Sequence, residues 1–178
     1  LYVRKGTRLH PLFHGHHEKN RRAGTENVAG IVGLGKALEL SLSHMAEYTN
    51  HMQDIKDYAI ERLSAEIEGI KFNGRSAEKE NSLYTVLSAL LPYKNPLIGL
   101  QLDMKGIAIS QGSACSSGAS KPSMVMMMVL SEDEMDHCTP LRISFSHMTT
   151  KAEIDTLVSA LKEISSDYTI EKTNVEHR

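Results

Sequence analysis

The sequence predicts an α/β fold in which helices and short strands alternate, and three observations support this. Apolar residues recur with helical spacing between residues 28 and 67. Short segments of strand-like texture follow, separated by Gly, Pro, Asn and Ser. A capping sequence at residues 150–153 opens a last amphipathic helix. Together these features indicate strands covered by helices.

The first helical segment begins at Asn27. Its apolar residues share one helix face through i, i+3, i+4 and i+7 spacing: Val28, Ile31, Val32, Gly35, Leu38, Leu42 and Met45. A second series continues this periodicity: Met52, Ile55, Ala59, Leu63 and Ile67. We expect two helices here, or one long helix that bends near residues 48–51.

Shorter elements are expected after Gly69. Their predicted order is strand 82–90, helix 95–105, strand 107–110, loop 111–120, helix 122–130 and strand 141–146. Gly106 ends the first of these helices, and Pro122 suits the first turn of the second.

The last predicted helix starts at the capping box Thr150–Glu153. Its buried face is expected to hold Ile154, Leu157, Val158, Leu161 and Ile164. Beyond about Ser166 the chain becomes polar, and we expect a frayed tail over residues 167–178.

The N-terminal segment predicts a short strand, 1–5, followed by a long polar loop, 8–27. The chain starts at Leu1 without an initiator Met, inside that strand. A strand needs a neighbour for its backbone hydrogen bonds. We therefore expect this chain to be a piece of a longer protein.

Charge and composition exclude several classes of protein. Lys and Arg number 20 against 22 Asp and Glu, which gives no reason to expect nucleic acid or an anionic membrane as a partner. No apolar run approaches the roughly 20 residues of a membrane span. The two cysteines lack metal-binding spacing, and this favours a reduced, cytoplasmic protein.

The most suggestive local feature is the loop around Cys115. Small residues surround this cysteine, with glycines on both sides, in the run Gln111-Gly-Ser-Ala-Cys-Ser-Ser-Gly-Ala-Ser120. An exposed, movable nucleophile suits such a loop. A buried structural cysteine is about equally compatible with the loop alone. Cys138, just before Pro140, is interpreted as structural.

Arg142 lies on a predicted strand among apolar neighbours. Its guanidinium can hold a carboxylate through two parallel hydrogen bonds if the side chain points into a cleft. An outward-facing arginine on a half-exposed strand is the plainer interpretation, and strand position alone favours it about two to one.

Two further groups lie in the first loop. His10, His14, His16 and His17 have spacing that zinc ligands can show, but no cysteine or helix face fixes their geometry, so no metal is assigned. The segment 21–27 offers a basic pair, a glycine and a hydroxyl ahead of a helix, which is typical of a phosphate site. Ordinary capping by Thr25 or Asn27 is the alternative.

These segments occur together in the order of a known family. They are Leu1-Tyr-Val-Arg-Lys-Gly-Thr7, Arg22-Ala-Gly-Thr-Glu-Asn27, Gly112-Ser-Ala-Cys-Ser-Ser117, and Leu141-Arg-Ile-Ser-Phe-Ser146 followed by Thr149, Thr150 and Glu153. From Leu1 to about Ile164 the chain resembles NifS/IscS-type cysteine desulfurases of the class V aminotransferase family, specifically their C-terminal portion.

The resemblance implies a type I pyridoxal-phosphate-dependent transferase fold that acts as a homodimer. Residues 1–68 would be the end of the cofactor-binding large domain with a long linking helix or helix pair. Residues 69–166 would be the small domain with the Cys loop, and 167–178 its polar tail. The implied reaction removes sulfur from L-cysteine, giving alanine and a protein-bound persulfide for a sulfur acceptor or scaffold protein.

By the same resemblance, Cys115 matches the persulfide-forming cysteine and Arg142 the arginine that holds the substrate carboxylate. Thr25 matches a threonine that reaches the cofactor phosphate of the neighbouring subunit. The lysine that forms the Schiff base with pyridoxal phosphate precedes the strand matching residues 1–5 and has no counterpart here. The family's Gly-Arg pair is Ser146-His147 in this chain.

Two alternatives remain open, beside a metal-binding protein that uses the histidine loop. One is a related enzyme, such as a selenocysteine lyase, although the long Cys115 loop favours the NifS/IscS group. The other is a non-catalytic dimerisation or binding fragment. The isolated chain is expected to be inactive in either case, because no lysine in it matches the Schiff-base position.

Overall fold

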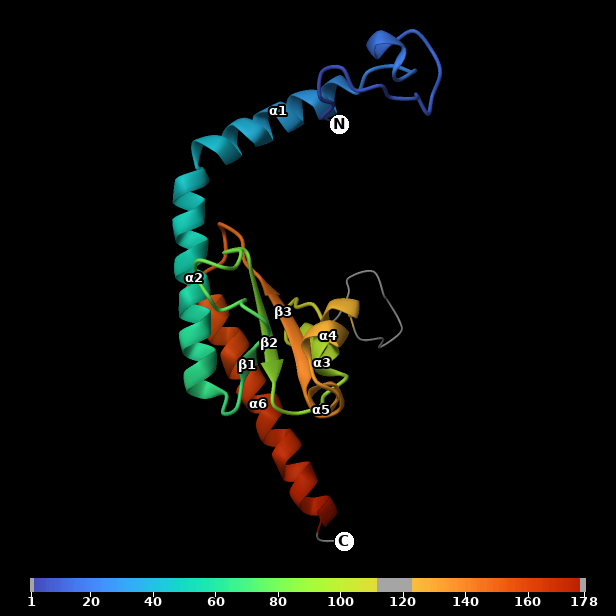
Figure 1. Ribbon diagram of the computed structural model, residues 1–178. Coiled ribbons are helices and arrows are strands. Elements are labelled where there is room, and N and C mark those ends of the chain that lie inside the picture. Colours follow the sequence, from blue (N-terminus) through green and yellow to red (C-terminus); the bar gives the residue numbers. More distant parts are fainter. Residues whose placement is uncertain (1, 112–122, 177–178) are drawn as a thin grey trace. The chain divides into compact units, whose positions relative to one another are not determined.

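The computed structural model describes residues 2–111 and 123–176, with side chains described as far as Ser166. Contacts divide the chain into two compact units, Leu1–His44 and Met45–Arg178. The first unit contains the helical turn η1 (Glu18–Asn20) and helix α1 (Val28–Ser43) (Figure 1). The second contains α2 (Met45–Glu66), β1 (Lys71–Phe72), β2 (Val86–Leu91), α3 (Ile98–Met104), α4 (Met124–Val129), α5 (Glu132–His137), β3 (Thr139–Ser144) and α6 (Lys151–Glu176).

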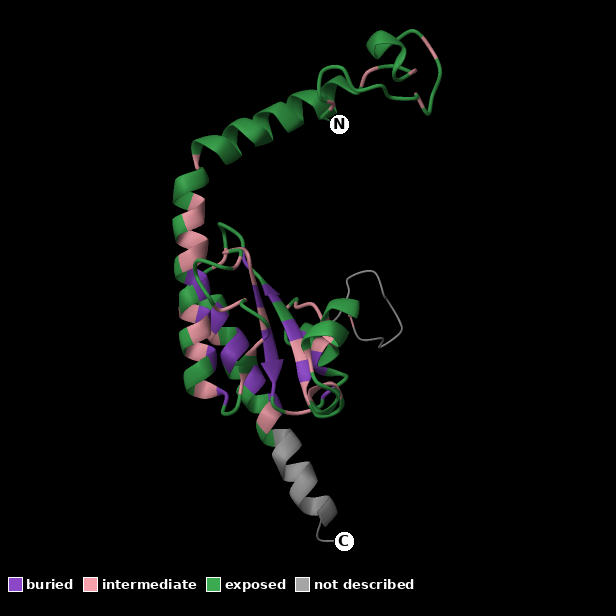
Figure 2. Cartoon of the chain, viewed as in Figure 1, coloured by how far each residue is buried: buried purple, intermediate pink, exposed green. Residues whose placement is uncertain are grey.

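The second unit is built on an antiparallel sheet in the order β1-β2-β3. Strand β2 pairs with β3 along its whole length, from Val86 opposite Ser144 to Leu91 opposite Thr139. Helix α6 contacts both α2 and α3, and these helices share one apolar core with β2 and β3. Figure 2 shows the buried residues gathered on the sheet and on the facing sides of these helices.

The second apolar series lies on the buried side of α2. Ile55, Ala59 and Leu63 on α2 are each at most 1% exposed, and Ile67 just after the helix is also buried. These positions are four residues apart, so they follow one side of the helix. The predicted apolar face of α6 is likewise buried, since Ile154, Leu157, Val158, Leu161 and Ile164 all belong to the core.

Helix α1 has the same kind of apolar pattern, but none of its residues is buried within its own unit. Its apolar side chains are more than two fifths exposed: Val28, Ile31, Val32, Leu34, Leu38, Leu40 and Leu42. Periodicity therefore predicted a helix correctly, whereas it said nothing about which residues would cover that helix.

Lys56 lies on the buried side of α2 with only 1% of its surface exposed. Its ammonium group donates to Ser82 Oγ and to the carbonyl of Leu83, both at 2.8 Å. Burial lowers the pKa of this lysine, and the charge of Asp57 opposes that shift. The two hydrogen bonds fix the segment before β2 against the middle of α2.

Several boundaries differ from the predictions. Of the two alternatives for residues 28–67, two helices are observed, with the break at His44, and not one helix bent near 48–51. The Ser43 and His44 side chains bond to the Leu40 carbonyl at this break. Residues 2–5 form no strand, since no described segment pairs with them. Helix α6 continues to Glu176, where a frayed tail was expected.

The strand predicted at 107–110 is reduced to one bridge, Ser110 with Arg142. Strand β1 and helix α5 were not predicted, because a two-residue strand and a six-residue helix are too short to show apolar periodicity. Pro122 lies outside the described residues, and α4 begins at Met124. Among the described residues, no helix is both long and apolar enough to cross a membrane.

The contrast between α1 and α2 gives a stability test. In the 178-residue chain, Leu63→Ala should lower the free energy of unfolding by about 2–5 kcal/mol, because it opens a cavity in the core. Leu38→Ala on exposed α1 should change it by less than about 0.5 kcal/mol. Denaturant unfolding followed by circular dichroism measures both. Equal losses for the two variants would mean that α1 is buried after all.

Candidate functional site

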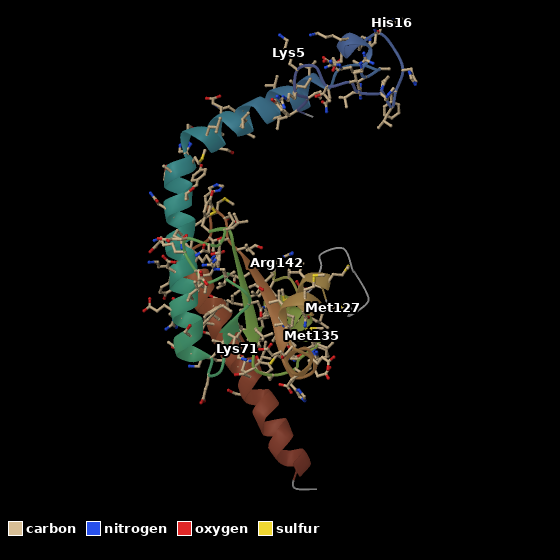
Figure 3. All side chains as sticks on the ribbon, in the orientation of Figure 1. Lys5, His16, Lys71, Met127, Met135 and Arg142 are labelled. Atoms are coloured by element: carbon tan, nitrogen blue, oxygen red, sulfur yellow. The ribbon has the colours of Figure 1, made fainter. Side chains whose placement is uncertain are left out.

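Arg142 lies in the middle of β3, and strand alternation directs its side chain away from the core. Leu141 and Ile143 on either side are 1% and 6% exposed, whereas Arg142 is exposed. In the register of β2 and β3, Arg142 lies opposite Ser88, and both are on the sheet face that is turned away from the core. Figure 3 shows its position on the sheet. The outward-facing interpretation of this arginine is therefore confirmed with respect to the apolar core.

The Arg142 guanidinium forms no hydrogen bond or ion pair with another described residue. Arg62 behaves differently, because its guanidinium contacts Asp155 at 3.0 Å and Glu66 at 3.1 Å. A guanidinium that is free of protein carboxylates keeps its forked donors available for a ligand carboxylate. Arg142 meets this requirement within the described part of the chain.

Ser110 pairs with Arg142 at the edge of β3 that does not face β2. The Arg142 N–H donates to the Ser110 carbonyl at 2.8 Å, and the Ser110 N–H donates to the Arg142 carbonyl at 3.3 Å. The chain thus enters the loop 111–120 directly beside Arg142. Sequence analysis did not single out Ser110, because its only signal was its place at the end of a predicted strand.

Cys115 lies within residues 112–122, outside the described residues, so its predicted role stays a prediction. The described residue Gln111 precedes it by four positions. The side chain of Gln111 donates to the Asn95 carbonyl at 3.2 Å. The start of the loop is therefore held by both backbone and side-chain hydrogen bonds.

Cys138, the other cysteine, is partly buried at the end of α5. Burial raises the pKa of its thiol, and the charge of Glu134 acts in the same direction. A thiol with a raised pKa is a poorer nucleophile at neutral pH. This environment agrees with the structural role predicted for Cys138.

In the N-terminal unit, a closed loop precedes Thr25. The Ala23 N–H donates to the Phe13 carbonyl at 3.2 Å. A Cβ at Gly15 would lie only 2.7 Å from the Cβ of Ala23, so only glycine permits this close approach. Figure 3 labels His16 in this loop. Its histidines, and the other described residues, contain no group of three or more His, Cys, Asp or Glu arranged to hold a metal ion.

Thr25 is exposed two residues before the cap of α1. Its carbonyl accepts a hydrogen bond from Arg22 Nη1 at 3.2 Å. The capping residue is Asn27, whose Oδ1 accepts from the Gly30 N–H at 3.0 Å. The Thr25 hydroxyl has no hydrogen bond to another described residue, so it remains available to an anion near this helix start.

Helix α5 lies between α4 and β3 in the chain, and a capping box fixes its start. Ser131 Oγ accepts from the Glu134 N–H at 3.2 Å, and Glu134 Oε2 accepts from the Ser131 N–H at 3.1 Å. The same carboxylate group contacts Lys71 of β1 at 2.9 Å. Glu134 thereby links α5 to the opposite edge strand of the sheet.

The comparisons with known proteins agree with this architecture. The model of the family described as "Aminotransferase class-V" matches residues 9–157. The chain belongs to that family. A solved structure titled "NIFS-LIKE PROTEIN" is 28% identical, with a TM-score of 0.74 over 93% of this chain and 41% of its own. A NifS-like protein from Rickettsia africae, 23% identical with a TM-score of 0.71, supports the fold alone. These matches confirm the predicted α/β fold.

The curated relatives of this class V chain carry the name cysteine desulfurase. "Cysteine desulfurase IscS" of Dictyoglomus turgidum is 37% identical over 166 residues, which are 92% of this chain. "Cysteine desulfurase" of Nostoc sp. is 38% identical over 165 residues. The chain spans about two fifths of the length of these relatives, 41% and 40% respectively. The resemblance to NifS/IscS-type proteins is therefore confirmed at the level of the family.

The Glu134 contacts predict a specific acid sensitivity. Its bonds to Lys71 and Ser131 lower the pKa of this carboxyl from 4.5 to about 2 in the folded chain. Between these two pH values the unfolded chain binds more protons, so stability should fall as the pH drops from 4.5 towards 2. Glu134→Gln should flatten this dependence, measured as the unfolding midpoint at each pH.

Lys71→Met provides the matched comparison, because it removes the largest single cause of the shift and leaves the capping box intact. It should flatten the acid dependence partially. An acid dependence identical in the parent chain and in Glu134→Gln would contradict the assignment.

Proposed function

We propose that the chain is the C-terminal part of a cysteine desulfurase that depends on pyridoxal 5′-phosphate. In this proposal the longer protein removes sulfur from L-cysteine, releases L-alanine and keeps the sulfur as a persulfide on Cys115. The persulfide then passes to an acceptor or scaffold protein for iron-sulfur cluster assembly or another sulfur-transfer pathway. The protein acts in the cytoplasm as a homodimer.

The observation that carries the proposal is the bridge between Ser110 and Arg142. It brings the start of the loop that contains Cys115 beside an arginine that has no carboxylate partner among the described residues. A carboxylate-binding group and a sulfur nucleophile must act on the same small amino acid. The loop with Cys115 starts next to Ser110, the bridge partner of Arg142, and this neighbourhood supports the two proposed roles. Relatives named cysteine desulfurase support them as well.

In this reaction the Cys115 thiolate attacks the sulfur of the bound substrate. An S–S bond forms as the bond between the substrate's Cβ and its sulfur breaks, and the electron pair stays with Cβ. Protonation of Cβ then gives alanine. Pyridoxal phosphate supplies the electron sink for this chemistry. Arg142 orients the substrate by holding its carboxylate.

The described residues fit the edge of a pyridoxal phosphate site. Thr25 offers an exposed hydroxyl near the start of α1, which suits a phosphate oxygen, and the family resemblance gives it that role across the dimer. Lys56 is the buried lysine of the chain's described part, and its amine is engaged by Ser82 and Leu83. The family resemblance gives the Schiff-base lysine a place before the segment that matches residues 1–5, so we assign it to the longer protein and expect the isolated chain to be inactive.

Replacement of Cys115 tests the nucleophile. In the longer protein, Cys115→Ser should abolish persulfide formation, because a hydroxyl oxygen cannot accept the sulfur, while the cofactor absorbance remains. Mass spectrometry after incubation with L-cysteine should find no added sulfur on the variant. Cys138→Ser is the matched control and should form the persulfide normally. Sulfur transfer that persists in Cys115→Ser would exclude Cys115 as the acceptor.

Replacement of Arg142 tests substrate binding. Arg142→Ala should raise the KM for L-cysteine roughly ten- to a hundredfold, since a charge-assisted arginine–carboxylate pair contributes about 1.5–3 kcal/mol. Cofactor affinity should change little. Arg75→Ala removes an exposed arginine that pairs with Glu78, and it should leave KM unchanged. The proposed role of Arg142 fails if its variant keeps the parent's KM.

A further inference from the structure

A polar cluster with a buried centre, Asn95 and Thr139, lies just before α3, and it includes the partly buried Gln111 and the exposed Gln101. Asn95 is 5% exposed. Its backbone N–H donates to Thr139 Oγ1 at 2.7 Å, and its Nδ2 donates to Gln101 Oε1 at 2.8 Å. Its Oδ1 accepts from the Leu97 N–H at 3.0 Å, and its carbonyl accepts from Gln111 Nε2 at 3.2 Å. Asn95 therefore uses its backbone and its side chain to join α3 to residue 111.

The cluster is also attached to the first residue of β3. Thr139 is 2% exposed, and its hydroxyl donates to the Tyr93 carbonyl at 2.8 Å while accepting from Asn95. Strand β3 carries Arg142 three positions later. The entry of the Cys115 loop and the strand that bears Arg142 thus share one set of hydrogen bonds.

Gln111 is confined on its other side as well. A Cβ at Gly99 would lie 3.3 Å from Gln111 Oε1, so the amide of Gln111 packs closely on the first turn of α3. Ser110, the preceding residue, is held by its two backbone bonds to Arg142. Gln111, the last described residue before Cys115, is therefore held by its own side-chain bond and by the backbone bonds of Ser110.

Hydrogen bonds suit this task better than apolar contacts. Apolar burial is non-directional and tolerates small displacements of the buried group. A buried amide loses its stabilisation when its partner moves by a fraction of an ångström, because the geometry of the bond is narrow. A buried and bonded polar cluster therefore specifies one arrangement of the chain.

We propose that Gln111 is a positioning residue for sulfur transfer, acting through its bond to Asn95. It fixes the point from which the loop starts, four residues before Cys115, relative to the strand that carries Arg142. This inference rests on the proposed function of Cys115 as the sulfur acceptor. Gln111 contacts neither substrate nor cofactor in this role.

The test uses the full-length holoenzyme with Gln111→Ala and Gln111→Glu. Alanine deletes the amide, and glutamate keeps its size but cannot donate to the Asn95 carbonyl when ionised. Both variants should form the Cys115 persulfide about tenfold more slowly in a single turnover, as expected when the loss of one positioning hydrogen bond is expressed in the barrier. The KM for L-cysteine and the cofactor absorbance should stay at the parent's values.

Asn73→Ala is the matched control for general destabilisation. Asn73 is 8% exposed and bonds Ser88 Oγ at 3.0 Å and the Ala89 carbonyl at 3.2 Å, on the β1 side of the sheet. It should lower the melting temperature while leaving the persulfide rate unchanged.

Three results would count against the inference. Equal slowing in Asn73→Ala and the Gln111 variants would assign the effect to stability. Parent-like persulfide rates in both Gln111 variants would overturn the positioning role and leave the proposed function standing. Absence of sulfur on Cys115 in the parent enzyme itself would overturn the proposed function, and the inference with it.

Discussion

The second unit depends on the pairing of β3 with a neighbour on each edge. Strand β2 lies along one edge, and Ser110 closes the other at Arg142. With both edges bonded, the strand cannot slip, because a shift of one residue would move Leu141 and Ile143 out of the core. The same alternation directs Arg142 away from the core. Core packing and the exposure of Arg142 therefore follow from a single register.

Polar contacts complete what the apolar core leaves undefined. Helices α2 and α6 are joined by the core and, at its margin, by Asp155, which accepts from Tyr58 at 2.8 Å and from Arg62 at 3.0 Å. At the opposite end of the sheet, Glu134 joins α5 to β1, and Asn95 joins α3 to the loop entry. The Glu134 contact fixes a helix that contributes no buried residue of its own, because none of α5 is buried. The Asn95 contact fixes the residue from which the loop with Cys115 starts.

The elements that sequence analysis predicted well are those with repeated apolar spacing. Leu63 and Leu161 lie on long amphipathic helices, and both are fully buried as the periodicity required. Helix α5 was missed although Ser131 and Glu134 form a capping box, because its apolar periodicity is absent. Periodicity also left open where α1 ends, because local side-chain bonds to the Leu40 carbonyl mark that end. Pairings such as Ser110 with Arg142 join distant segments, so local patterns cannot predict them.

Local sequence patterns also could not predict the surroundings of Arg142, which the fold provides. Sequence position alone favoured an ordinary exposed arginine at residue 142, and exposure is what the fold displays. Exposure does not separate an idle surface arginine from one that binds a ligand, because both point to solvent. The neighbours of each arginine give further evidence. Arg62 and Arg75 have carboxylate partners, whereas the Arg142 guanidinium has none among the described residues and stands next to a doubly anchored loop entry. A charge with no protein partner among the described residues, beside an anchored backbone, supports the proposed carboxylate-binding role of Arg142.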